Sequence, residues 1–205
     1  MESEINEVTR PSRAEAKAQT RRSLLEAARD VFLSVGYQGA TLDEIAATAG
    51  FTKGALYWHF PNKQAVFLAL IADAIENNLY ILDRLLDPDI SKPADIKEHL
   101  GCWIDGIDGR EVLPAFGVEL EIEARRDPSF RALHQSLIGK HETALGEFLG
   151  RYFELVGETP PMPVAELAST LVTVFKGFAL VRQNRPNHQV TSARVAKMLL
   201  NIPAE

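Results

Sequence analysis

The stretch TLDEIAATAGFTKGALYWHFPNK, residues 41–63, contains the pattern that decides the fold. Thr41 and Glu44 have the spacing of a capping box, in which each side chain accepts a hydrogen bond from the other residue's backbone at the start of a helix. Gly50 stands where this short helix would end, because glycine enters a left-handed turn at little cost. Thr52 can cap the helix that follows. We therefore expect two short helices joined by a glycine turn.

Two such helices, within residues 42–60, are typical of a helix-turn-helix, whose second helix enters the major groove of DNA. Ala46 lies four residues before Gly50, where only a small side chain lets the two helices pack closely. Leu56 and Phe60 are also four residues apart, and we expect both to face the core. Helical hairpins with a glycine turn also occur in proteins that bind no DNA, so this pattern alone leaves that alternative open.

The first residues of the second helix are suited to reading DNA bases. Lys53 can donate to guanine O6 and N7, Gly54 lets the backbone come close, and Ala55 can touch a thymine methyl group. One turn later, Tyr57 and His59 carry polar groups on rigid rings, which suits contacts with phosphate oxygens. We expect base contacts from the first three residues and backbone contacts from the two rings.

Lys63 and Trp58 complete this aromatic and basic segment. Lys63 adds a positive charge at the start of the next helix, whose N-terminus itself favours phosphate. For Trp58 we expect packing on a neighbouring helix, and a contact with a DNA sugar is the alternative. The aromatic cluster would then have two sides, one that anchors the helix and one that grips DNA.

The charge of the chain is unevenly distributed. The net charge is −6, yet residues 10–63 contain 8 Lys and Arg against 5 Asp and Glu. A basic segment on an acidic chain indicates a nucleic-acid contact at one pole, with a solvated charged tail as the alternative. Residues 1–18 lack hydrophobic periodicity, and we expect a mobile basic arm there that can become helical toward its end. Arg10 and Arg13 can add phosphate or minor-groove contacts from this arm, with plain disorder as the alternative.

The rest of the chain has helical periodicity and no run of alternating β-branched residues. We expect an all-α fold of about nine helices without a parallel sheet. Residues 19–63 would form a helix-turn-helix DNA-binding domain, and residues 64–205 a ligand-binding and dimerisation domain. The later helices are expected at residues 94–107, 110–125, 129–156, 164–184 and 192–200.

Two further helices are expected on either side of the DNA-reading segment. The first runs from Gln19 to a turn made by Gly36 and Gly39. The second is a long helix that Asn62 caps and that Asp87-Pro88-Asp89 ends.

Two segments resemble the DNA-binding signature of the tetracycline-repressor (TetR) family. They are Thr41-Leu-Asp-Glu-Ile-Ala and Ala49-Gly-Phe-Thr-Lys-Gly-Ala-Leu-Tyr-Trp-His-Phe-Pro-Asn-Lys63, and the resemblance extends over residues 20–67. It implies a homodimeric transcriptional regulator, usually a repressor, that binds a palindromic DNA operator. It also implies that a small-molecule effector binds the C-terminal domain and lowers operator affinity. The DNA-contacting residues expected from this resemblance and from the residue chemistry are Thr41, Thr52, Lys53, Gly54, Ala55, Tyr57, His59 and Lys63.

The last two long helices are the expected dimer interface. Residues 129–156 and 164–184 carry wide apolar stripes, which suit a four-helix bundle between two chains, with filling of the monomer's own core as the alternative. An effector pocket is expected between the long helix after residue 62 and the helices within residues 94–150. Its candidate lining residues, each of which can instead belong to the core, are Trp103, Phe116, Glu119, Phe130, His134, His141 and Phe175.

The sequence disfavours other classes of protein. Cys102 is the single cysteine, which excludes an internal disulfide and a cysteine-based zinc site. The histidines show no Glu-x-x-His spacing and there is no Gly-rich phosphate loop, so we expect no metal, no cofactor and no enzymatic activity. Glu166 and Lys176 interrupt Val164–Val181, so we expect a cytoplasmic protein without a membrane span. A helix-turn-helix activator or structural DNA-binding factor without a small-molecule ligand is the alternative function.

Overall fold

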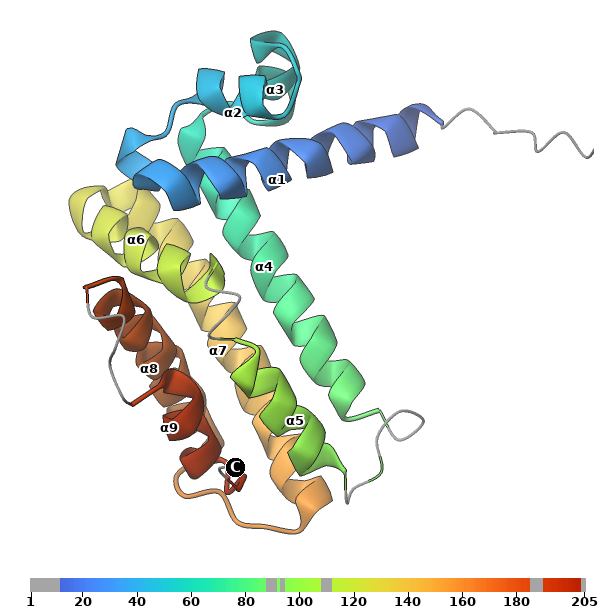
Figure 1. The fold of residues 1–205 in the computed structure, drawn as a ribbon, viewed down its shortest axis with the longest axis vertical. Coiled ribbons are helices and arrows are strands. Elements are labelled where there is room, and N and C mark those ends of the chain that lie inside the picture. Colours follow the sequence, from blue (N-terminus) through green and yellow to red (C-terminus); the bar gives the residue numbers. More distant parts are fainter. Residues whose placement is uncertain (1–11, 88–91, 93–94, 108–111, 185–189, 204–205) are drawn as a thin grey trace, which may run out of the picture. The chain divides into compact units, whose positions relative to one another are not determined.

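The structure, a computed structural model, describes residues 12–87, 92, 95–107, 112–184 and 190–203. Every regular element in these ranges is a helix, which confirms the expected all-α fold of nine helices (Figure 1). The helices are α1 (Arg13–Gly39), α2 (Leu42–Thr48), α3 (Lys53–His59), α4 (Lys63–Leu85), α5 (Ile96–Asp105), α6 (Val112–Arg126), α7 (Pro128–Val156), α8 (Val164–Asn184) and α9 (Ser192–Leu199).

Helix α1 begins earlier than expected. The Ser12 amide donates to Glu15 Oε2 at 2.7 Å, and the Glu15 amide donates to Ser12 Oγ at 3.2 Å, so a complete capping box opens the helix. Residues 13–18, at the end of the expected arm, are helical, in keeping with the expectation that the arm can become helical there. The rest of that arm, residues 1–11 with Arg10, lies outside the described residues.

The end of α1 is interrupted as the glycines predict. Gly36 has φ 71° and ψ 173°, which breaks the helical path before a final short turn. Such a positive φ is readily adopted only by glycine. The Ala40 amide then donates to the Gly36 carbonyl at 3.2 Å and closes the segment.

The chain divides into two compact units, Met1–Leu70 and Ile71–Glu205. The boundary lies inside α4 rather than at residues 63/64, where we expected it. The first turns of α4 belong to the N-terminal unit because they fill its core: the Phe67 ring centroid lies 5.1 Å from that of Phe32 and 4.8 Å from that of Tyr37. The other large side chains buried in this unit are Leu24, Leu25, Val31, Ile45, Leu56, Phe60, Val66 and Leu70.

In the C-terminal unit, α7 and α8 lie side by side and both pack against α6, while α9 packs against α5 and α8 (Figure 1). Tyr152 of α7 is fully buried, and its hydroxyl donates to the Leu200 carbonyl at 2.8 Å. This hydrogen bond ties the end of α9 to the centre of the unit. The surrounding core consists mainly of Leu82, Ile96, Leu100, Ile104, Phe148, Leu149, Phe153, Leu167, Leu171 and Ala196.

Two helices are long and apolar enough to cross a membrane by length and composition alone. They are Lys63–Leu85 and Val164–Val181, and 33% and 17% of their respective windows are buried. Core and interface helices of proteins outside membranes meet the same criteria. The expectation of no membrane span therefore stays a prediction, and α8 is notable for how much apolar surface it leaves uncovered.

Candidate nucleic-acid interface and ligand site

Both short helices of the helix-turn-helix begin at a threonine cap. The Thr41 hydroxyl accepts from the Glu44 amide at 3.1 Å, and the Thr52 hydroxyl accepts from the Ala55 amide at 3.2 Å. Each hydroxyl keeps its own proton for donation to an external acceptor, as a phosphate contact would require. Gly50 joins the two helices with φ 72°, the left-handed conformation that the sequence predicts.

The buried side of α3 is made by Leu56, and the cap residue Phe60 follows the helix into the same core. The exposed fractions of Leu56 and Phe60 are 0% and 4%, so the prediction that both face the core is confirmed. Tyr57, the residue after Leu56, points away from this core and is 47% exposed. The consecutive aromatic residues are thus divided between a core face and a solvent face.

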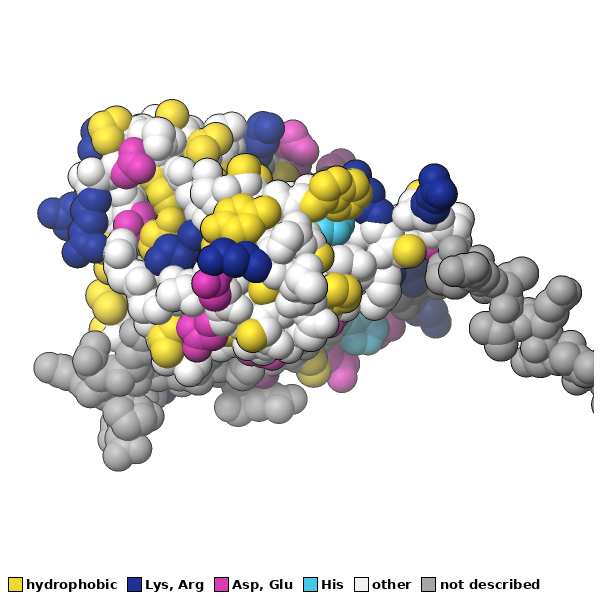
Figure 2. All heavy atoms as spheres, turned by 90° about the horizontal axis from the view of Figure 1, so that it is seen from above, with side chains coloured by type: hydrophobic (Ala, Val, Ile, Leu, Met, Phe, Trp, Pro, Cys, Tyr) yellow, Lys and Arg dark blue, Asp and Glu magenta, His cyan; other side chains and the backbone are white. Residues whose placement is uncertain are grey.

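Trp58, which we expected to pack on a neighbouring helix, meets α1 through a cation–ring contact and stays exposed to solvent. It is 65% exposed, and the Lys17 ammonium of α1 lies 4.4 Å from the centre of its ring. The edge of the indole meets the His59 ring at a centroid distance of 4.8 Å. Because its core-facing positions are taken by Leu56 and Phe60, α3 turns Trp58 outward. Figure 2 shows the face viewed from above Figure 1, where basic, hydrophobic and histidine side chains lie next to one another.

The residues expected to read bases lie at the exposed start of α3. Lys53 is paired with the carboxylate of Asp43 in α2, with its ammonium 2.8 Å from Oδ2 and 2.7 Å from Oδ1. The hydrogen bond to Asp43 raises the pKa of Lys53. Gly54 has open space beside it, since a Cβ there would meet only the Thr52 hydroxyl at 3.9 Å. A ligand can therefore approach this backbone closely, next to a lysine that must leave Asp43 to bind it.

His59 ends α3 and is partly buried. Burial lowers the pKa of His59, and the positive charges of Lys17 and Arg21 lower it further. The neutral ring that this favours has one N–H donor, which is enough for a single phosphate contact.

Lys63 occupies a different position from the one that its place in the sequence suggests. Its ammonium donates to the carbonyls of Tyr37, Gln38 and Ala40 at 2.7, 3.2 and 3.0 Å. It also lies 4.6 Å from the centre of the Tyr37 ring. The phosphate contact expected of Lys63 stays a prediction, but all three donors of its ammonium are engaged at the end of α1.

The candidate ligand residues are divided between core and polar surroundings. Phe116 and Phe130 are almost completely buried, Phe175 packs against the core, and Glu119 is partly exposed. Trp103 is partly buried, and among the described residues its indole Nε1 has no acceptor. The expectation that these seven residues line one effector pocket stays a prediction.

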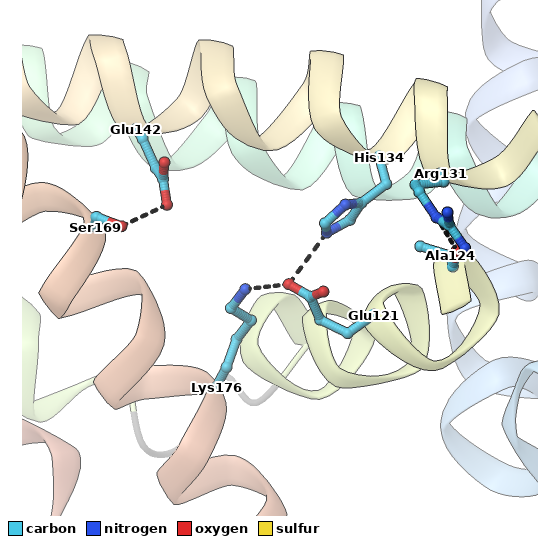
Figure 3. A network of polar contacts seen from close by, with 7 residues as sticks. All are labelled: Glu121, Ala124, Arg131, His134, Glu142, Ser169 and Lys176. Atoms are coloured by element: carbon cyan, nitrogen blue, oxygen red, sulfur yellow. Dashed lines mark hydrogen bonds and ion pairs between the residues drawn. The ribbon is translucent and has the colours of Figure 1, made fainter. Parts of the chain in front are cut away.

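His134 is the candidate that joins a polar cluster, which connects α6, α7 and α8 (Figure 3). The Lys176 ammonium donates to Glu121 Oε1 at 2.7 Å. His134 Nε2 lies 3.2 Å from the same oxygen, close enough for an ion pair but without hydrogen-bond direction. Burial opposes ionisation of Glu121, but the hydrogen bond and charge of Lys176, joined by His134, lower the pKa of Glu121.

Lys176 of this cluster was not predicted as a site residue. In the sequence it only interrupts an apolar stretch, although a lysine within such a stretch signals a specific partner. His141, by contrast, is buried in α7, and burial lowers the pKa of His141. Among the residues that the structure describes, no group of three His, Cys, Asp or Glu side chains is arranged to hold a metal ion.

Known proteins resemble this chain in its N-terminal part and, more distantly, over most of its length. The family described as "Bacterial regulatory proteins, tetR family" matches residues 24–70. The HTH-type transcriptional regulator TtgW of Pseudomonas putida is 48% identical over 65 residues, which cover 32% of this chain and 48% of TtgW. The chain thus matches about half the length of that relative. The HTH-type transcriptional repressor AcnR of Corynebacterium diphtheriae is 30% identical over 161 residues, which cover 77% of this chain and 78% of AcnR.

A solved structure shares the fold at low sequence identity. The transcriptional regulator FadR from Bacillus subtilis, in complex with stearoyl-CoA, has a TM-score of 0.65 and 14% identity. The superposition covers 88% of this chain and 95% of FadR, so both units have counterparts in one regulator. Together with the helix-turn-helix geometry of α2 and α3 and the match to AcnR over most of both chains, these findings show that the chain belongs to the TetR family of bacterial transcriptional regulators.

Proposed function

We propose that this protein is a cytoplasmic transcriptional repressor that binds a palindromic operator as a homodimer and releases it when a small-molecule effector binds. The observation that carries the proposal is the two-sided α3, which is anchored by the buried Leu56 and exposes Tyr57 on the other face. A rigid helix with a free polar face is the geometry that major-groove reading requires. The protein acts by binding and catalyses no reaction.

Within this proposal, the exposed residues divide into two groups. Lys53, Gly54 and Ala55 read base edges, because they lie at the N-terminal end of α3 where a recognition helix meets the bases. Thr41, Thr52, Tyr57 and His59 hold the DNA backbone, because a phosphate oxygen accepts hydrogen bonds from hydroxyl and imidazole groups alike. Loss of a residue in the first group changes the preference for particular DNA sequences, whereas loss of a residue in the second group lowers the affinity for DNA of any sequence.

The homodimer is proposed to form through α7 and α8. Only 17% of the apolar window Val164–Val181 is buried, and Leu180 and Val181 are 47% and 37% exposed. An apolar helix face of this kind is stabilised when a second helix covers it. A symmetric dimer places two recognition helices one turn of DNA apart, roughly 34–36 Å, and its two-fold symmetry demands a palindromic operator.

The effector is proposed to bind the C-terminal unit. The structural relative FadR from Bacillus subtilis was solved with stearoyl-CoA, so a protein of this fold holds a small molecule. In this chain, the buried indole Nε1 of Trp103 is a donor for which the described residues supply no acceptor. Because an unpaired buried donor is costly, an effector with an acceptor group placed there gains a hydrogen bond. Release of DNA then requires the effector to prefer one spacing of the recognition helices over the other.

The test is DNA binding measured by fluorescence anisotropy across a salt series, with DNA from just upstream of the protein's own coding region. Wild type, Tyr57→Ala and Tyr80→Ala are compared, because Tyr80 of α4 is also an exposed tyrosine, at 63%, but lies in the other unit. We expect two protomers to bind each DNA site. Tyr57→Ala should lose DNA binding, whereas Tyr80→Ala should bind DNA as the wild type does. Weak binding that is indifferent to sequence and to Tyr57 would contradict the proposal. Binding that no compound releases would favour the ligand-free alternative.

A further inference from the structure

A lysine within the apolar stretch of α8 reaches across to α6. Only 18% of the Lys176 side chain is exposed. Its aliphatic part passes over Gly117 of α6, where an added Cβ would lie 3.0 Å from both Cγ and Cδ of the lysine. The glycine thus leaves room for this crossing. Because the lysine is confined by the two helices, its ammonium is held at one position between them.

The Lys176 ammonium and the His134 imidazole converge on one carboxylate oxygen (Figure 3). Glu121 Oε1 lies 2.7 Å from Lys176 Nζ and 3.2 Å from His134 Nε2. The lysine makes a hydrogen bond to this oxygen, whereas the buried Nε2 has no hydrogen-bond partner among the described residues. A buried nitrogen without a hydrogen bond is costly. The cluster therefore contains a hydrogen-bonding group that Glu121 leaves unsatisfied.

The three side chains differ in how firmly the fold holds them. The His134 side chain is 12% exposed, whereas that of Glu121 is 45% exposed. Glu121 can turn into water at little cost, while the imidazole and the ammonium stay in place. Burial opposes the ionisation of Glu121, yet Lys176 and His134 lower the pKa of Glu121. The position that these two groups face thus favours a carboxylate anion.

The neighbouring side chains favour a ligand with one negative charge and an apolar body. Three phenylalanines on the same helices are buried or partly buried, each at most one turn along the chain from Gly117, His134 or Lys176. They are Phe116, Phe130 and Phe175. One ammonium and one imidazole match a single carboxylate, and an anion with two charges would be repelled by the nearby Glu121.

We propose that Lys176 and His134 bind the carboxylate of an organic monocarboxylic acid, which takes the place of the Glu121 side chain. This inference names the chemical class of the effector and so rests on the proposed function. The acid accepts hydrogen bonds from the Lys176 ammonium and from the His134 ring with its proton on Nε2, while Glu121 moves into water. Because the Glu121–Lys176 hydrogen bond links α6 to α8, the exchange removes one tie between these helices. The bound acid favours the state of lower DNA affinity.

The first experiment titrates sodium benzoate calorimetrically into wild type, Glu121→Gln, Lys176→Met and Glu142→Gln. Glu142 of α7 is the matched control, because its carboxylate accepts a hydrogen bond from the Ser169 hydroxyl of α8 at 3.1 Å instead of pairing with Lys176. Glu121→Gln removes the competing charge and should bind benzoate about tenfold more tightly than wild type. Lys176→Met keeps an apolar chain beside Gly117, and binding should weaken at least about tenfold. Glu142→Gln should bind as the wild type does.

The second experiment compares ligands and separates binding from folding. Acetate, octanoate and the uncharged benzyl alcohol are titrated in parallel, and the thermal unfolding of each variant is measured without ligand. We expect octanoate to bind, acetate to bind more weakly, and benzyl alcohol not to bind. If none of the three acids binds wild type or Glu121→Gln, the Lys176–Glu121 pair is only structural and the inference is refuted. Benzyl alcohol that binds as tightly as benzoate, with Lys176→Met unaffected, would also refute it.

DNA anisotropy with and without benzoate distinguishes this inference from the proposed function. We expect benzoate to lower the operator affinity of wild type and to leave that of Lys176→Met unchanged. If wild type binds DNA and an uncharged compound releases it while no acid binds, the proposed function stands and the acid site is refuted. If wild type binds no operator but takes up benzoate through Lys176, the acid site stands and the proposed function fails.

Discussion

Replacing Lys63 with methionine separates a structural role from a DNA contact. Methionine keeps the unbranched apolar part of the side chain and removes the ammonium. In the structure, that ammonium donates to three carbonyls at the end of α1, those of Tyr37, Gln38 and Ala40, at 2.7, 3.2 and 3.0 Å. The carbonyls of Tyr37 and Ala40 are part-buried, so water replaces the lost donor poorly there.

The expected loss follows from these contacts. A hydrogen bond to a charged group contributes about 1.5–3 kcal/mol, and the cation over the Tyr37 ring adds about 0.5–1 kcal/mol at a site open to solvent. The three bonds share one ammonium, and the bond to Gln38 is exposed, so their contributions do not add fully. We expect Lys63→Met to lower the free energy of unfolding of the N-terminal unit by about 2–4 kcal/mol.

The assay pairs urea unfolding with the salt dependence of DNA binding. Trp58 fluorescence in the Trp103→Phe background reports on the N-terminal unit, which contains only the first of these tryptophans. The control is Lys53→Met, because Lys53 is exposed and its one ion pair among the described residues, with Asp43, is a surface pair that contributes little to stability. We expect Lys63→Met to lose stability and to keep the wild-type salt slope, since its ammonium is already engaged within the protein.

The sequence pattern alone supports the opposite result, a uniform loss of affinity with a slope lower by about 0.9 per protomer. If Lys63→Met unfolds within about 0.5 kcal/mol of wild type and shows that lower slope, then Lys63 binds phosphate and our reasoning from the three carbonyls is wrong.

Four further substitutions test other contacts. Asp43→Asn frees the Lys53 ammonium for one more phosphate contact, so the fall in affinity for non-specific DNA between 50 and 200 mM salt should become about threefold larger per protomer, as anisotropy with a mixed-sequence duplex would show. Lys53→Ala should relax preference at one base position by about 1–3 kcal/mol, measured by competition among single-base operator variants. Burial lowers the pKa of His141, so at acidic pH the unfolded chain binds a proton that the folded chain does not. The stability of the wild type should therefore fall as the pH drops below about 6.5. Between pH 7.5 and 5.5, the urea midpoint of His141→Gln should fall less than that of the wild type. Tyr152→Phe leaves the Leu200 carbonyl without its donor and should cost about 1–2 kcal/mol in urea unfolding at unchanged DNA affinity.

Much of the DNA-reading segment could be predicted from the sequence because its signals are local. The Thr41 and Thr52 caps and the Gly50 turn each depend on residues at most four positions away, and the structure contains all three. The start of α1 depends on an equally local signal, the Ser12–Glu15 capping box, which the search for hydrophobic periodicity overlooked. Burial of Leu56 followed from helical spacing in the same way.

The partners of individual charged and aromatic side chains were decided only by the tertiary structure. Lys63 meets a carbonyl 26 positions earlier, and Lys176 of α8 meets a carboxylate 55 positions earlier in α6. A local pattern specifies which face of a helix is apolar, but the neighbour that covers that face depends on how the helices cross. For this reason the sequence by itself determined the nine helices and the recognition helix, whereas the exposure of Trp58 beside Lys17 and the engagement of Lys63 arose only when distant helices packed together.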